Sequence, residues 1–365
     1  MTGPAPKPGV MKINPYIGGD SGLDGFDLVI KLSSNEGAFG PSPDAARAYR
    51  DVAGSLHLYP DGGMSELRQV IGTSQGLDPE RIICGAGSDE IISLLCSAYA
   101  GAGDEVLYSQ YGFLMYAISA HAAGATPISA PESHLTADVD SLLTAVSDKT
   151  RIVFLANPNN PTGTYLPRAE VARLRQGLRD DILLVIDAAY AEYVSREDYH
   201  EGNDLVDAGD NVIVTRTFSK IHGLGGIRLG WAYGPTGVID VLNRIRGPFN
   251  VSSAAQAAGA AAIRDSAFVK KVRTHNLTWL AWTRSQLLDL GLEVTDSVGN
   301  FLLVCFKSQP GRTARDADAA LKAEGIIVRG VAGYGLPDCL RITVGQETHM
   351  RQVVDVLRKF MGKNQ

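Results

Sequence analysis

The chain has 365 residues, of which 45% are hydrophobic and 20% are charged, so it can bury a large core and divide into a large and a small domain. Its formal net charge of −6 and its scattered lysines and arginines argue against a nucleic-acid partner, which would need a basic surface. The N-terminus lacks the apolar core of a signal peptide, and no apolar run approaches the roughly 18 residues of a membrane span, so we expect a cytoplasmic protein with no membrane partner.

The N-terminal segment, residues 1–32, is rich in glycine and proline and contains only one short apolar stretch, which predicts an arm that packs on another part of the protein. Residues 32–43, LSSNEGAFGPSP, are interpreted as a long irregular loop, and such a loop in an enzyme usually lines a site. A flexible surface leader is the alternative. A helix is predicted near residues 44–52, followed by a turn at residues 59–63.

A strand, a glycine turn and an apolar helix follow in the string RIICGAGSDEIISLLCSAYA, residues 81–100. The N-terminus of such a helix attracts anions through its free backbone amides. The string begins like the dinucleotide motif G-x-G-x-x-G, but Glu90 stands at the third glycine position, where helix and strand must pack closely. We therefore reject a nicotinamide site and predict a phosphate-binding turn formed by Gly87, Ser88 and Asp89.

Four further apolar runs, DEVLYSQYGF, RIVFLANPNNPTG, ILLVIDAAY and NVIVTRTFSK, each end in polar residues, and helical segments separate most of them. This pattern predicts an α/β fold with a mostly parallel central sheet that is buried on both faces. Ligands of such sheets bind beyond the carboxyl ends of the strands, which is where the unusual polar residues stand. One site can therefore collect them.

From about residue 249 the pattern changes to long helical stretches, residues 252–290, followed by the strand-like runs FLLVCF and CLRITV. This change predicts a smaller α+β domain. We expect a large domain over residues 33–248, with residues 1–32 and 249–365 forming the N-terminal arm and the small C-terminal domain.

The string NVIVTRTFSKIHGLGGIRLGW, residues 211–231, carries the strongest chemical signal. Lys220 follows a strand between hydroxyl groups and precedes Arg228 by eight residues, which puts an amine able to form a Schiff base beside a potential phosphate site. When Lys220 is considered without the surrounding motif, the alternative is an ordinary solvated lysine. The whole string S-K-x-x-x-L-x-G-x-R-x-G resembles the lysine motif of the class I and II aminotransferases, which are fold-type I enzymes that use pyridoxal 5'-phosphate.

The resemblance implies a role for each matching residue. Lys220 would bind the cofactor as a Schiff base and move the proton, Asp187 would face the pyridine nitrogen, and Tyr111 would stack on the ring. The ring oxygen would receive hydrogen bonds from Asn160 and Tyr190, and Lys220, Asp187 and Tyr190 would be the catalytic residues. The resemblance also implies a homodimer with shared active sites, in which Tyr59 of the partner subunit would contact the phosphate. The phosphate ligands from the same chain would be Gly87, Ser88, Asp89, Thr217, Ser219 and Arg228.

Within the family, the strings L-S-S-N-E-x-x-x-G-P-S-P, N-P-N-N-P-T-G and C-L-R-I-T-V-G are similar to the histidinol-phosphate aminotransferase subgroup. That subgroup converts histidinol phosphate and 2-oxoglutarate to imidazole-acetol phosphate and glutamate in histidine biosynthesis. Two departures, Ala188 in D-A-A-Y and the sequence Ser109-Gln110 before Tyr111, leave a broad aromatic aminotransferase open. The residues that the resemblance assigns to substrate binding are Tyr16, Asn35, Arg329 and Arg341.

The spacing of the cysteines and histidines does not indicate a second functional site. The cysteines lack metal-type C-x-x-C spacing and a dense framework, which predicts buried thiols in a reducing compartment, at Cys84, Cys96, Cys305 and Cys339. The histidines are scattered without H-x-x-x-H spacing, so we expect no metal site. Two other protein classes remain: an oxidoreductase on a nucleotide-binding fold, which Glu90 disfavours, and a non-catalytic regulator that binds pyridoxal phosphate, which usually carries a separate DNA-binding module.

Overall fold

The computed structural model describes residues 3–15, 18–307 and 309–363. Tyr16, which the sequence predicts to bind substrate, lies outside the described residues. Within them, no helix combines the length and the apolar character that crossing a membrane requires.

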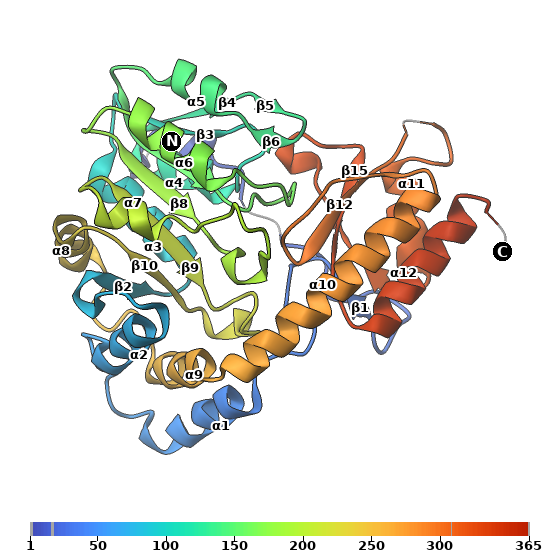
Figure 1. The fold of residues 1–365 in the computed structure, drawn as a ribbon, viewed down its shortest axis with the longest axis horizontal. Helices are drawn as coiled ribbons and strands as arrows, with labels where there is room; N and C mark the ends of the chain where they lie inside the picture. Colours follow the sequence, from blue (N-terminus) through green and yellow to red (C-terminus); the bar gives the residue numbers. More distant parts are fainter. Residues whose placement is uncertain (1–2, 16–17, 308, 364–365) are drawn as a thin grey trace.

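A seven-stranded sheet forms the centre of the larger part of the chain (Figure 1). Five of its strands, β4, β3, β7, β8 and β9, run parallel to one another, and β10 runs antiparallel to both β9 and β2. This confirms the predicted mostly parallel sheet. The order across the sheet is β2 (Ile82–Gly85), β10 (Gly230–Tyr233), β9 (Val212–Thr217), β8 (Leu183–Asp187), β7 (Thr150–Ala156), β3 (Glu105–Ser109) and β4 (Thr126–Ala130).

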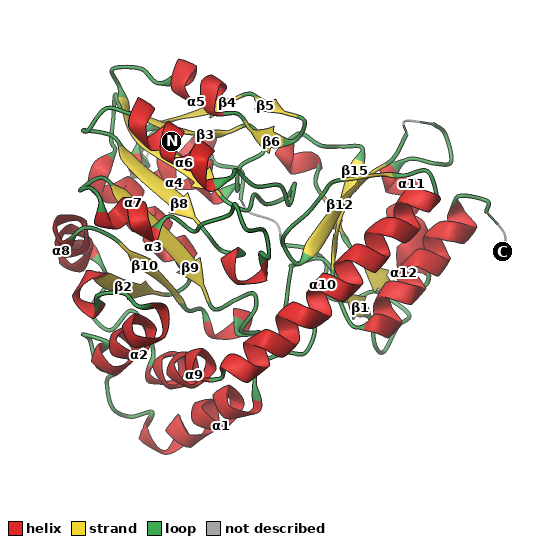
Figure 2. Ribbon diagram, viewed as in Figure 1, coloured by secondary structure: helices red, strands yellow, loops and turns green. Residues whose placement is uncertain are grey.

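Both faces of this sheet are covered by helices, as Figure 2 shows. Successive side chains of a strand point to opposite faces, so Val212 and Val214 pack in one core and Ile213 packs in the other. This double burial explains why the strands are continuous apolar runs in the sequence. One core includes residues of α3 (Ser88–Tyr99), α4 (Met115–Ala123) and α8 (Thr236–Ile245). The other includes residues of α1 (Pro43–Asp51), α2 (Ser65–Gln75), α5 (Val139–Ala145), α6 (Arg168–Gly177), α7 (Asn203–Asp207) and α9 (Ser253–Arg264).

A second, smaller layer of sheet and helices occupies the C-terminal part. Its antiparallel strands have the order β11 (Glu293–Val294), β12 (Phe301–Cys305), β15 (Cys339–Thr343) and β14 (Arg329–Gly330). Three helices share a core with these strands: α10 (Ser266–Asp289), α11 (Ala314–Ala323) and α12 (Glu347–Phe360). The N-terminal arm joins this part, because β1 (Ile30–Lys31) pairs in parallel with β13 (Ile326–Ile327).

The helical stretch predicted over residues 252–290 consists of two helices with a break at Asp265, whose side chain accepts the Phe268 N–H at the start of α10. Helix α9 packs in the core of the seven-stranded sheet, whereas the later turns of α10 pack with the small sheet. The predicted domain bounds stay a prediction. The packing of α9 favours a boundary at Asp265 rather than near residue 249, and we propose that position.

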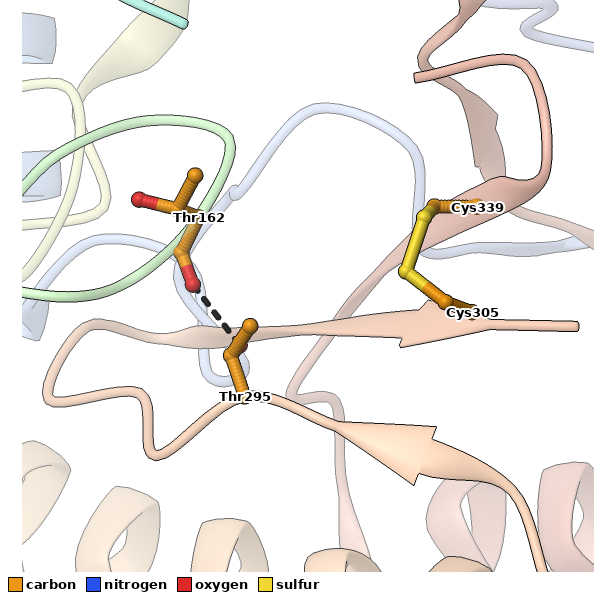
Figure 3. The surroundings of a disulfide bond; sticks show 4 residues. All are labelled: Thr162, Thr295, Cys305 and Cys339. Atoms are coloured by element: carbon orange, nitrogen blue, oxygen red, sulfur yellow. Dashed lines mark hydrogen bonds between the residues drawn. A yellow bond between two sulfur atoms is a disulfide. The ribbon is translucent and has the colours of Figure 1, made fainter. Parts of the chain in front are cut away.

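A disulfide joins β12 to β15 in the small sheet (Figure 3). Cys305 and Cys339 lie directly opposite each other in the register of these antiparallel strands, with Cα atoms 4.1 Å apart. The prediction of four buried thiols is therefore wrong for this pair and holds only for Cys84 and Cys96. Linear spacing could not reveal the pair, because only the strand register brings residues 34 positions apart together. The expectation of a reducing compartment stays a prediction.

Candidate active site

A cavity of about 280 Å³ lies at the carboxyl ends of the central strands, with walls from the large sheet, the residue 33–36 loop and the small sheet. Because parallel strands deliver their carboxyl ends to one edge, polar residues far apart in the sequence meet there. Most of the predicted site residues line it: Asn35, Ser88, Asp89, Asn160, Asp187, Tyr190, Thr217, Ser219, Lys220, Arg228, Arg329 and Arg341.

Lys220 follows the carboxyl end of β9 and places its amine in this cavity. Its Nζ donates to the Ser34 carbonyl oxygen at 3.2 Å and lies 5.7 Å from the centre of the Tyr190 ring. Burial, together with the nearby Arg341 guanidinium, lowers the Lys220 pKa to about 8. About a tenth of the amine is therefore unprotonated at pH 7, far more than for an ordinary lysine, which suits a nucleophile or a proton acceptor.

Asp187 is the last residue of β8, and only 6% of its surface is exposed. Its Oδ2 accepts from the Tyr116 hydroxyl at 2.7 Å, and its Oδ1 accepts from the Thr215 hydroxyl at 3.1 Å. Burial raises the pKa of this carboxyl group. Both hydrogen-bond partners are neutral hydroxyls, so a cationic ligand group in the cavity would stabilise the buried carboxylate by balancing its charge. Tyr116 was not among the site residues predicted from the sequence, because it lies within an apolar helical segment.

An anion site forms where α3 begins. Gly87 precedes the helix with a φ of 88°, and a Cβ at that position would lie 2.6 Å from Arg228 Nη2. The free amides of the first helical turn face the same region as the Thr217 and Ser219 hydroxyls. Arg228 Nη1 lies 3.4 Å from Ser219 Oγ, and its Nη2 lies 3.1 Å from Asp89 Oδ2. Amides at a helix N-terminus, two hydroxyls and a guanidinium together suit a phosphate group.

Two arginines approach the cavity from adjacent strands of the small sheet. Arg329 of β14 and Arg341 of β15 are direct partners in the register. Arg341 is buried; its Nη1 donates to Asn160 Oδ1 at 2.5 Å, and its Nη2 donates to the Ser33 carbonyl oxygen at 2.7 Å. Its Nε has no hydrogen-bond partner among the described residues. These contacts leave the positive charge of Arg341 available to an anionic ligand.

Tyr111 is not among the residues that line the cavity, and its stacking role stays a prediction. Tyr111 packs against a small-domain cluster that includes Tyr334, and its backbone N–H donates to Glu132 Oε1 at 3.1 Å. Phe113, two residues further on, lines the cavity instead. A tight turn lies between the two rings, at Gly112, whose N–H donates to the Ser109 carbonyl oxygen at 2.7 Å. The spacing of aromatic residues alone could not show this turn.

Tyr59 lies away from the cavity of its own chain. Its side chain is 83% exposed, and its ring stacks on Phe249 with the centroids 4.8 Å apart. It does not line the cavity that collects the other predicted phosphate ligands.

The sequence model described as aminotransferase class I and II matches residues 27–357. The chain belongs to this family. Among similar aminotransferases, the histidinol-phosphate aminotransferase of Paramagnetospirillum magneticum is 60% identical over 99% of this chain and 100% of its own length. That of Rhodospirillum rubrum is 59% identical over 98% of this chain and 97% of its own length.

The aminotransferase fold is also shared with a solved structure. The histidinol-phosphate aminotransferase of Sinorhizobium meliloti, in complex with pyridoxal 5'-phosphate, is 30% identical and has a TM-score of 0.89. The match covers 97% of this chain and 96% of that chain. These matches confirm the predicted fold-type I aminotransferase fold and enzyme class.

Proposed function

We propose that the protein transfers the amino group between histidinol phosphate and 2-oxoglutarate, giving imidazole-acetol phosphate and glutamate, in histidine biosynthesis. The observation that carries the proposal is one cavity that holds the Lys220 amine, the buried Asp187 carboxylate and two arginines on adjacent strands. The names of the two sequence relatives described above support the choice of substrate.

The described residues fit pyridoxal 5'-phosphate, the cofactor of the related Sinorhizobium meliloti structure. Among the residues that the structure describes, the side-chain hydrogen-bond partners of Asp187 are the hydroxyls of Tyr116 and Thr215, so the carboxylate would hold the protonated ring nitrogen, while Phe113 would cover the ring. When bound, the cofactor supplies an electron sink for negative charge that develops at the substrate α carbon. Its phosphate would be held by Ser88, Asp89, Thr217, Ser219 and Arg228, and its ring oxygen by Asn160 and Tyr190.

The remaining work falls to side chains of this chain. Lys220 Nζ, with a pKa of about 8, accepts the proton from the substrate α carbon and would pass it to the cofactor in the first half of the reaction, and it would carry a proton in the opposite direction in the second half. Asp187 keeps the ring nitrogen protonated by its negative charge. Arg341 and Arg329 bind the anionic end of each substrate, a carboxylate in glutamate and a phosphate in histidinol phosphate, because a guanidinium fork accommodates both groups.

The experiment that tests this function compares half reactions of the purified holoenzyme with histidinol phosphate, phenylalanine and tyrosine. The absorption change of the bound cofactor gives kcat/KM for each amino donor. We expect histidinol phosphate to react with the highest kcat/KM. Equal or faster reaction of the aromatic amino acids would replace the proposal with a broad aromatic aminotransferase, and no reaction with any donor would point to a non-catalytic regulator.

We also propose a homodimer with shared active sites. Tyr59 is exposed beside other large apolar side chains that the chain itself leaves uncovered, Leu56, Leu58 and Phe249. A second copy of the chain would cover them, and its cavity would receive the Tyr59 phenol as a phosphate ligand. An isologous contact of this kind creates two equivalent mixed sites.

A further inference from the structure

We propose that Asn35 is a positioning residue that orients the Tyr190 phenol as a hydrogen-bond donor into the cavity. Sequence analysis assigned Asn35 to substrate binding, but the structure gives its side chain two other partners. The inference rests on the proposed function, because the acceptor that it implies is the ring oxygen of pyridoxal phosphate.

The hydrogen bonds of the Asn35 amide define its orientation. The Thr343 hydroxyl accepts the Asn35 backbone N–H at 2.9 Å, and it lies 3.1 Å from Asn35 Oδ1. Because the Thr343 oxygen accepts this N–H, its own proton is available for a bond to Asn35 Oδ1. With Oδ1 facing Thr343, the Nδ2 group of the same amide points away from Thr343. Nδ2 lies 2.9 Å from the Tyr190 hydroxyl oxygen.

This orientation decides the direction of the Tyr190 proton. An amide nitrogen donates and does not accept, so the phenol oxygen must be the acceptor in its bond with Asn35. The phenol keeps its own proton for a different partner. Since Tyr190 lines the cavity and is otherwise buried, that partner is a group bound in the cavity.

The surroundings of Tyr190 keep it protonated. Burial raises the Tyr190 pKa, and the nearby Asp187 and Tyr334 act in the same direction, while Arg341 and the Asn35 hydrogen bond oppose them. The Lys220 amine also approaches the face of the ring. The net direction favours the neutral phenol, which is the form that can donate.

Asn35 is held too firmly to act as an adaptable substrate ligand. It is fully buried, and its φ of 56° lies in the left-handed region that asparagine tolerates better than most residues. Its carbonyl oxygen accepts from Asn300 Nδ2 at 3.0 Å, in addition to the two contacts with Thr343. Thr343 follows Arg341 by two residues on β15, so the same strand carries an anion-binding arginine and the support of Asn35.

The principal test is Asn35→Asp in the holoenzyme. This change keeps the size, the tolerance of the left-handed backbone and the oxygen that faces Thr343, but it replaces the donor to Tyr190 with an acceptor. The phenol proton would then turn to the new carboxylate, and the cofactor ring oxygen would lose its donor. A lost donor destabilises the negative charge on that oxygen, so the bound cofactor should change its absorption at a pH higher by about one unit or more.

A neutral variant separates the donor effect from the effect of the added charge. Asn35→Gly removes the amide and still accepts the backbone conformation. We expect a smaller shift in the same direction, and a larger fall in kcat than rise in KM. In a Tyr190→Phe background, Asn35→Gly should add almost nothing further to the shift, because the two residues act through one hydrogen bond.

Asn211→Asp is the matched control, since Asn211 Nδ2 donates to the Ile182 carbonyl oxygen at 3.0 Å just before the start of β9, at the opposite end of the sheet. It should leave the spectral titration unchanged. If the Asn35 variants do not fold, Thr343→Val should shift the titration in the same direction and Thr343→Ser should restore it.

Asn35→Gly with an unchanged spectral titration and kcat but a raised KM would overturn the inference and return Asn35 to substrate binding. The inference would also be overturned if Asn35→Gly shifted the spectral titration equally in the wild-type and the Tyr190→Phe backgrounds. A wild-type protein that binds no pyridoxal phosphate would instead refute the proposed function.

Discussion

At the residue scale, Lys220 is the side chain on which both halves of the proposed reaction depend. We expect Lys220→Ala to abolish transamination while pyridoxal phosphate still binds noncovalently through Asp187 and the phosphate ligands, because the variant loses only the amine. Steady-state assays and cofactor dialysis measure the two effects, with Lys149→Ala, an exposed lysine, as the control. Turnover near the wild-type rate, or a borohydride-fixed adduct on another lysine, would refute the assignment.

The lowered pKa of Lys220 makes a separate prediction for the cofactor-free protein. Below a pH of about 8 the amine is mostly protonated and unreactive, so its reaction rate with pyridoxal phosphate should rise with pH and level off above about 8. An amine with the ordinary pKa of a lysine would keep gaining reactivity towards a pH of about 10. Stopped-flow absorption and peptide mapping after reduction distinguish the two. A Lys220 profile that still rises at pH 10 contradicts the effect of burial.

Asp187→Asn should slow the chemical step more than it weakens substrate binding. A neutral amide no longer stabilises the protonated ring nitrogen, and this loss is largest in the transition state. We expect a large fall in kcat with a small change in KM. Tyr116→Phe, which removes one hydrogen bond to the carboxylate, should give a weaker effect of the same kind. An unchanged kcat for Asp187→Asn would leave Asp187 with a structural role only.

At the scale of elements, the turn between β3 and α4 carries both candidate stacking rings, Tyr111 and Phe113. Phe113→Ala should weaken pyridoxal phosphate binding about twofold to tenfold, as the loss of one aromatic stacking contact of roughly 0.5–1.5 kcal/mol predicts. Tyr111→Ala should have less effect on cofactor affinity, because Tyr111 packs in a cluster beside the cavity. Equilibrium titration of the two variants gives the ranking, and the reverse ranking would restore Tyr111 as the stacking residue.

The same comparison shows what could be predicted from the sequence. Strand runs with polar ends identified the parallel sheet and brought Asp187 and Lys220 to one edge, since that step needs only the direction of the strands. That Phe113 and not Tyr111 lines the cavity depends on a turn geometry that spacing does not encode. The Cys305–Cys339 disulfide and the Asn35 contact with Thr343 depend on tertiary contacts between distant segments of the chain.

At the scale of the whole molecule, the proposed dimer makes Tyr59 a ligand of the neighbouring site. A charge-assisted hydrogen bond to phosphate is worth roughly 1.5–3 kcal/mol, so Tyr59→Phe should loosen pyridoxal phosphate by about tenfold or more. Equilibrium binding and sedimentation measure the affinity and the oligomeric state. An active enzyme that remains monomeric would refute the shared site.

A mixed dimer gives the sharper test of this sharing. One subunit carries Tyr59→Phe and the other carries Lys220→Ala, so the site that keeps Lys220 receives an intact Tyr59 from its partner. That site should bind pyridoxal phosphate with wild-type affinity. Weakened binding there would mean that Tyr59 serves its own subunit.

Helix α10 connects the two parts of the chain that form the cavity. Its first turns pack beside Tyr190, and its later turns pack with the small sheet, so it spans the two sides of the cavity. A helix of 24 residues is about 36 Å long, and a rotation of roughly 5° about its first turn would swing its last turn by about 3 Å. The later turns of α10 share a core with β15, so a rotation of this kind that carried the small sheet along would move Arg341 relative to Asn160 on the opposite wall of the cavity.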